Sequence, residues 1–157
     1  MKGLLSSFRW AWQGFAHCLR TQRNLRIHLT AAALALWFAG RFGLGRAECA
    51  LLWLTIGLVI AAELFNTAAE KLTDLCCPGF DRRAGLIKDI AAGAVLAAAV
   101  AAAGVGICLF WRPLLWQQLL GRPQQLVVPL AIVAVGIWAV FGLPYAEKET
   151  INQKEQE

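Results

Sequence analysis

Hydrophobic residues are grouped along this chain into four long stretches, separated by shorter segments that carry most of the charges. The stretches are residues 28–42, 49–65, 90–111 and 126–143. A helix needs about 17 to 25 mainly apolar residues to cross the hydrocarbon core of a bilayer. The pattern therefore predicts an all-α integral membrane protein. Residues 28–111 would form a core of three transmembrane helices, and residues 112–146 a linker and a fourth, C-terminal transmembrane helix.

The first 27 residues have a different pattern. Apolar side chains recur there at spacings of three and four, while Arg9, Gln13 and Arg20 lie to the side. This is the pattern of an amphipathic helix, and its basic residues interrupt the apolar run that a cleavable signal peptide would need. We expect residues 1–27 to form a helix that lies along the membrane surface. Residues 147–157 are expected to be a charged, solvated cytoplasmic tail.

Composition and charge agree with a membrane protein and set its orientation. Hydrophobic residues make up 59% of the 157 residues, charged residues only 16%, and the mean hydropathy is +0.56. Lys and Arg favour the cytoplasmic side of short loops. Eleven of the fifteen lie in the N-terminal segment, in 71–88 or after residue 143. Both termini are therefore expected in the cytoplasm. The net charge of +5 is better explained by anionic lipid headgroups than by nucleic acid.

Four polar side chains form a stripe at the cytoplasmic end of the second predicted core helix. Glu63, Asn66, Glu70 and Asp74 are spaced so that a helix places them within an arc of about 80°. Ionisable groups at membrane depth are costly unless they are paired, hydrated or bound to something. Glu63 could be a buried carboxyl bonded to Asn66 or Thr67, and Glu70, Lys71, Asp74 and Lys88 could be ordinary interfacial ion pairs, but the default interpretation is a functional site.

Phosphoryl transfer would need a base, carboxylates for Mg²⁺ and a cation for phosphate oxygens. No phosphate-binding loop of the soluble type is present. Glu63 is nearest to the bilayer interior, where desolvation favours a general base. Glu70, about two turns nearer the cytosol, suits a metal ion, and Asn66 can orient either neighbour by hydrogen bonds.

These residues also match a known family. Residues 62–70 (AELFNTAAE), then Asp74, then 88–96 (KDIAAGAVL) closely resemble the signature of the small bacterial integral-membrane diacylglycerol kinase and undecaprenol kinase family. Residues 21–28 (TQRNLRIH) resemble the segment that leads into the family's first membrane helix. The resemblance covers roughly residues 8–110. The combination of motifs on two membrane helices is far more specific than any one of them.

The resemblance implies an ATP- and Mg²⁺-dependent lipid kinase in the bacterial inner membrane, working as a homotrimer with active sites shared between protomers. Carried over by motif, Glu63 would be the catalytic base and Asn66 a residue that orients the site. Glu70 would bind Mg²⁺ and contact the nucleotide. Lys88 and Asp89 would contact the nucleotide, and Asp74 would have a supporting role.

The acceptor implied by the resemblance is a lipid alcohol. The sequence Arg-Ile-His before the first membrane helix is similar to the undecaprenol-kinase branch, so undecaprenol is preferred and diacylglycerol is the alternative. Gln22 stands where the family often has a glutamate that helps to hold the metal and nucleotide; it offers a carbonyl oxygen without charge. The fourth helix lies outside the family core, and its role is left open between a topology device and a partner-binding helix.

Several other readings follow from the same residues. An acidic stripe in a bundle also occurs in small proton- or cation-conducting oligomers, although the distant halves of the membrane segments lack acids apart from Glu48. A noncatalytic membrane adaptor is a third class. His28 is interpreted as an interfacial or packing residue and the five cysteines as structural. Arg23 and Arg26 are interpreted as lipid-headgroup contacts, with contact to nucleotide phosphate as the alternative.

Overall fold

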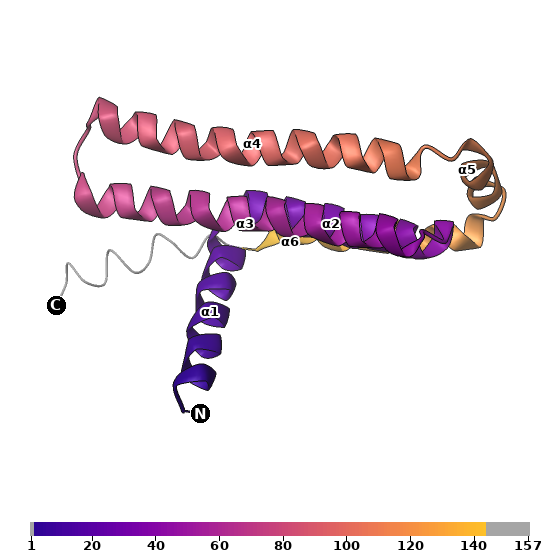
Figure 1. Ribbon diagram of the computed structural model, residues 1–157, viewed down its shortest axis with the longest axis horizontal. Helices are drawn as coiled ribbons and strands as arrows, with labels where there is room; N and C mark the ends of the chain where they lie inside the picture. Colours follow the sequence, from indigo (N-terminus) through magenta and orange to yellow (C-terminus); the bar gives the residue numbers. More distant parts are fainter. Residues whose placement is uncertain (1, 144–157) are drawn as a thin grey trace.

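The computed structural model describes residues 2–143 and contains only helices within that range (Figure 1). The long α-helices are α1 (Lys2–Thr21), α2 (Arg23–Phe42), α3 (Arg46–Cys76), α4 (Arg82–Phe110) and α6 (Val127–Gly142). The shorter α5 (Pro113–Leu120) and the 3₁₀ helix η1 (Pro123–Leu126) connect α4 to α6. The predicted tail at 147–157 lies outside the described residues.

Three helices are long and apolar enough to cross a membrane: α3, α4 and the continuous segment Pro123–Gly142, which contains η1 and α6. This confirms three of the four predicted spans by length and composition. The fourth, residues 28–42, belongs to α2, which is not among them. Arg26, His28 and Arg41 lower its hydropathy. The predicted grouping into three core helices and an additional one stays a prediction.

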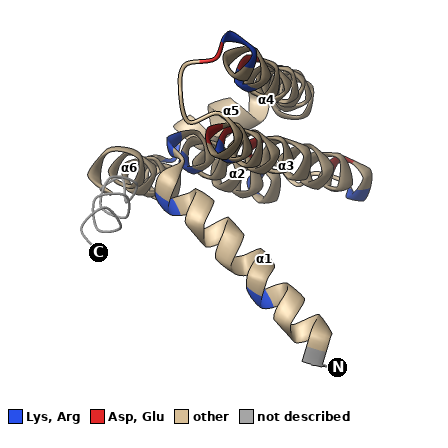
Figure 2. Cartoon of the chain, turned by 90° about the vertical axis from the view of Figure 1, so that its left-hand side faces the viewer, with Lys and Arg blue, Asp and Glu red and all other residues tan. Residues whose placement is uncertain are grey.

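The helices α3 and α4 form a long antiparallel pair, α2 packs against α3, and α6 packs against α2 (Figure 1). Helix α1 points away from this bundle (Figures 1 and 2), an orientation compatible with the predicted location on a membrane surface. The α3–α4 loop lies at one end of the bundle and α5 at the other. These are called below the loop end and the α5 end.

Local sequence explains where the helices begin and end. Gln22, in extended conformation, separates α1 from α2, five residues before the predicted boundary at 27/28. Gly43 ends α2 with φ +63°, a left-handed conformation that glycine adopts without strain. The Asp81 carboxylate caps α4 by accepting from the Arg83 N–H at 2.6 Å. Pro113 begins α5, where its missing N–H has no intrahelical partner to lose.

The packed core lies toward the α5 end. Ala39, Leu52 and Leu109, from α2, α3 and α4, form its buried centre. Beside it, Trp116 of α5 packs on Phe38 and Phe42 with ring centroids 4.9 and 5.1 Å apart. Most charged residues of α3 and α4 lie instead toward the loop end, which Figure 2 views directly; Arg46 and Glu48 are at the other end of α3. The candidate site lies between these two regions.

Candidate functional site

A pocket of about 260 Å³ lies beside Glu63, between α2, α3 and α4. Its polar wall comes from two helices: Asn24 and His28 of α2, and Glu63 and Asn66 of α3. Its apolar wall comes from α4 and consists of Ala92, Val95, Leu96 and Ala99. The pocket therefore places a carboxylate, an imidazole and two amides opposite a hydrocarbon surface.

Glu63 is only 1% exposed and has an oxygen that is not hydrogen bonded. Its Oε1 lies 3.3 Å from Nε2 of His28, in contact but without the geometry of a hydrogen bond. Asn66 Oδ1 is also buried without a partner among the described residues. Because most buried polar atoms are paired, two such oxygens at one pocket indicate a place where a ligand's polar group would bind.

Asn66 lines the same pocket as Glu63 and is hydrogen bonded to Glu70. Its Nδ2 donates a hydrogen bond to Glu70 Oε1 at 2.9 Å. The carbonyl oxygen of the same amide is the buried atom without a hydrogen-bond partner, and Asn66 lines the pocket. Since the amide is held through its nitrogen, the orientation of its oxygen is fixed by Glu70. Removal of the Glu70 carboxylate would therefore also release Asn66.

Asp74 and Lys88 form an ion pair across α3 and α4, with Oδ1 and Nζ 2.5 Å apart. Both side chains are partly exposed at the loop end. Asp89 is exposed. Ala92 lines the pocket and follows Lys88 and Asp89 by four and three residues, so all three are neighbours on one helical surface. Lys88 and Asp89 thus lie one turn from the pocket, toward the loop end, and do not line it.

Gln22 lies at the junction of α1 and α2 and also does not line the pocket. Its backbone N–H donates to the Cys18 carbonyl at 2.7 Å. The Cys18 thiol lies against Thr67 of α3, and burial raises the pKa of this thiol. The junction is therefore beside the α3 turn between Glu63 and Glu70. The predicted residues form two groups: Glu63, Asn66 and Glu70 around the pocket, and Asp74 with Lys88 beyond it.

Sequence reasoning missed the contribution of α2 to the pocket. Asn24 and His28 are four residues apart and therefore share a helical face. That spacing was the available signal, but nothing in the sequence shows that this face meets Glu63. The interpretation of His28 as a packing residue missed its contact with the carboxylate.

The interpretation of Arg26 as a headgroup contact is wrong. Arg26 is 2% exposed and donates to backbone carbonyls of Leu19 and Ala139, at 2.7 and 2.9 Å. Its neighbour Arg23 is exposed, but its guanidinium lies over the Phe141 ring, 4.4 Å from the centroid. Both arginines are thus engaged by the protein itself, on the side of α2 that faces α6.

The chain is similar to lipid kinases of bacteria. The family model described as prokaryotic diacylglycerol kinase matches residues 9–110. A diacylglycerol kinase of Synechocystis sp. is 45% identical over 113 residues, which are 71% of this chain and 65% of that protein. The undecaprenol kinase of Bacillus subtilis is 36% identical over 104 residues, which are 66% of this chain and 85% of that protein.

The chain thus spans a little under two thirds of the Synechocystis relative and most of the Bacillus one. No solved structure matches the chain. The matched residues 9–110 include every residue that lines the Glu63 pocket, and α5, η1 and α6 follow after them. This chain is a member of the prokaryotic diacylglycerol kinase family.

Proposed function

We propose that this protein is an ATP- and Mg²⁺-dependent lipid kinase that transfers the γ-phosphate of ATP to the hydroxyl of a lipid alcohol. The observation that carries the proposal is the buried Glu63 oxygen, which lies against His28 and makes no hydrogen bond, in a pocket with one apolar wall. A carboxylate in such a place is suited to accept the proton of an alcohol. Family membership supports the same reaction class.

A second pocket supports a substrate with a long hydrocarbon part. It has a volume of about 280 Å³, lies between α2, α3 and α4, and shares His28 and Ala99 with the Glu63 pocket. The rest of its wall is almost entirely apolar and runs toward Phe110 at the α5 end. A lipid hydroxyl at Glu63 would therefore continue into an apolar space within the bundle, while the nucleotide would approach from the charged loop end.

The proposed reaction is an in-line displacement. The Glu63 carboxylate takes the proton from the acceptor hydroxyl, and the alcohol oxygen forms a bond to the γ-phosphorus. The bond between that phosphorus and the bridging oxygen breaks, and ADP leaves with the electron pair. His28, which lies against Glu63, would position this carboxylate, and the Asn66 carbonyl would orient the hydroxyl. Lys88 and Asp89 would contact the nucleotide from the loop end, with Asp74 in support through its ion pair with Lys88.

Glu70 and Gln22 are the residues that would hold Mg²⁺. Among residues 2–143 no three His, Cys, Asp or Glu side chains come together as a ligand set. Mg²⁺ is commonly bound by only one or two carboxylates, with water and substrate phosphates as the other ligands. One carboxylate with one amide oxygen fits that mode. The ion would neutralise charge on the transferred phosphoryl group.

For the acceptor we propose undecaprenol, with diacylglycerol as the alternative. The relatives' names include both a diacylglycerol kinase and an undecaprenol kinase. The segment 21–28, which contains the pocket residues Asn24 and His28, resembles the undecaprenol-kinase branch, and this supports the preference. We further propose a homotrimer with shared sites and with both termini in the cytoplasm.

The test is phosphate transfer from radiolabelled ATP to undecaprenol and diacylglycerol presented in the same micelles. We expect labelled undecaprenyl phosphate in larger amount, and a loss of about 10²- to 10⁴-fold in the Glu63→Gln variant. Glu48→Gln changes a carboxyl at the α5 end of the same helix and serves as the matched control, with turnover retained. Full activity of Glu63→Gln would refute the assigned base. Ion flux through liposomes without ATP, together with no labelled lipid, would favour the conducting oligomer.

A further inference from the structure

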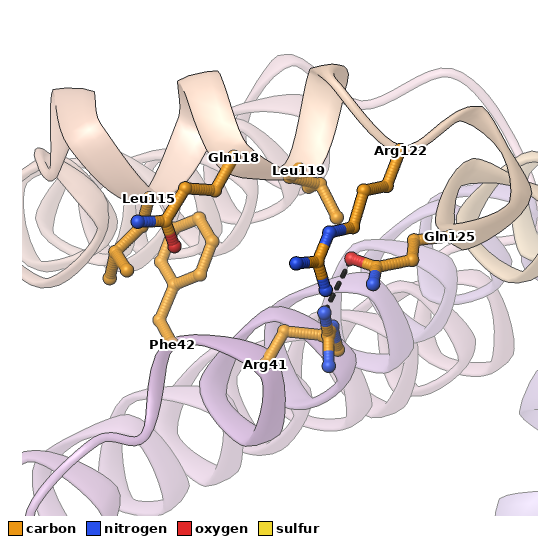
Figure 3. Close-up of a pocket in the computed structure, with 7 residues that line it drawn as sticks. All are labelled: Arg41, Phe42, Leu115, Gln118, Leu119, Arg122 and Gln125. Carbon is orange, nitrogen blue, oxygen red and sulfur yellow. Dashed lines mark hydrogen bonds between the residues drawn. The ribbon is translucent and has the colours of Figure 1, made fainter.

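A separate polar pocket lies at the α5 end (Figure 3), and it shares no lining residue with the Glu63 pocket. It has a volume of about 80 Å³, and its polar lining consists of Arg41, Gln118, Arg122 and Gln125. Arg41 comes from the last turn of α2, and the other three come from α5, η1 and the turn between them. The pocket therefore exists only where the segment after residue 110 folds back onto α2.

Two guanidinium groups face each other across this pocket (Figure 3). Arg41 Nη2 donates to Gln125 Oε1 at 2.5 Å, whereas the Arg122 side chain makes no hydrogen bond or ion pair within residues 2–143. No acidic side chain lines the pocket. Glu48, the acidic residue at this end in the described part of the chain, is paired with Arg112 at 2.6 Å. Two like charges thus converge, and no acidic side chain in the pocket lining offsets them.

The groups around the pocket match the chemistry of a phosphate. Arginine presents a planar fork of N–H donors that pairs with phosphate oxygens, often through two bonds at once. The Gln125 oxygen is occupied by Arg41, so its amide nitrogen remains a donor. A cavity of roughly 10–15 Å³ holds one water molecule, so a pocket of about 80 Å³ admits several non-hydrogen atoms.

The remaining lining is apolar and consists of Phe42, Leu115 and Leu119. The pocket is at the opposite end of α2 and α3 from the Asp74–Lys88 pair, so the spanning helices place it near the other membrane surface. Lipid phosphates are concentrated at that level. We propose that this pocket binds a phosphate group, carried by an anionic lipid headgroup or by free phosphate. The proposal is independent of the kinase reaction.

The test compares Arg122→Gln with Arg46→Gln in the full-length protein. Within residues 2–143 the Arg122 side chain makes no hydrogen bond or ion pair that its replacement would break, and Arg46 is an exposed arginine at the same end that does not line the pocket. Native mass spectrometry would measure retention of dioleoyl phosphatidylglycerol against dioleoyl phosphatidylcholine. Isothermal titration would measure binding of inorganic phosphate. We expect Arg122→Gln to weaken phosphate binding at least tenfold, and Arg46→Gln less than twofold.

The two probes distinguish the source of the phosphate. Loss of phosphatidylglycerol retention in Arg122→Gln assigns a lipid headgroup, and loss of inorganic phosphate binding alone assigns a free anion. Equal binding of both probes by the two variants, or no binding of either probe by the unmodified protein, would overturn the proposal. Glu63→Gln should bind both probes as the unmodified protein does, so loss of kinase activity does not affect this result.

Discussion

Arg26 is predicted to hold the ends of three helices together. Its guanidinium donates to the carbonyls of Leu19 and Arg20 in the last turn of α1, to Ala139 in the last turn of α6, and to Leu143 just beyond it. The last carbonyls of a helix have no intrahelical partner and carry the negative end of the helix dipole. A buried cation on α2 thus satisfies two helix C-termini at once.

The cost of removing this side chain can be worked from those contacts. A hydrogen bond to a charged group contributes about 1.5–3 kcal/mol, and the contributions of neighbouring bonds do not add in full. The contact to Leu143 is 3.5 Å long and adds little. We expect Arg26→Met to lose about 3–5 kcal/mol, as when a buried charged partner is removed. That is a large part of the roughly 5–15 kcal/mol that stabilises a typical domain.

Arg23→Met is the matched control, since Arg23 is three residues away on the same helix. Its exposed contact with the Phe141 ring contributes only about 0.5–1 kcal/mol. Thermal unfolding in detergent micelles and the rate of trypsin cleavage after Arg20 would compare the variants. We expect Arg26→Met to unfold at a clearly lower temperature and to be cleaved faster. Equal unfolding temperatures for Arg26→Met and Arg23→Met would refute the reasoning.

Three further predictions concern other contacts. A Cβ at Gly136 would lie 2.3 Å from Thr30 Cγ2, so Gly136→Ala should lose about 1–3 kcal/mol of stability, and added Thr30→Ala should recover most of it in thermal unfolding. His28→Gln removes the imidazole beside Glu63. It should lower kcat about tenfold, or ~1.4 kcal/mol, with little change in KM. An unchanged kcat would contradict this. In a single-cysteine protein, exposed Cys76 should react with a membrane-impermeant maleimide only from the cytoplasmic side, and labelling from the outside would reverse the proposed orientation.

The spans α3, α4 and α6 could be predicted because length and apolarity are properties of the local sequence. That α2 is less apolar than a membrane span but packs within the bundle could not be predicted, because its polar residues have partners elsewhere in the chain. Arg26 bonds to carbonyls of α1 and α6, and His28 meets Glu63 of α3. In a hydropathy pattern these residues only lower the mean hydropathy of the segment, and their partners do not enter it. Helix α5 lies in the predicted linker, although Pro113 at its start was a usable signal.

The candidate site divides in the same way. Glu63, Asn66 and Glu70 are on one helix, so a rotation of about 100° per residue is enough to place them on one face. The hydrogen bond between Asn66 and Glu70 spans one turn of that face. Asn24 belongs to a different helix, and its position at the pocket depends on how α2 packs on α3. Local periodicity cannot supply that packing.

The segment after residue 110 supports the candidate site through α2. One face of α2 carries Asn24 and His28 toward the Glu63 pocket, and another carries Arg26 and Thr30 toward α6, where Thr30 meets Gly136 without room for a side chain. Helix α2 is less apolar than the three helices that could span a membrane. Its polar side chains therefore need hydrogen-bond or charge partners on the neighbouring helices. If α6 were displaced, Arg26 would lose its acceptors on that side and α2 would be free to shift, and the contact between His28 and Glu63 would shift with it.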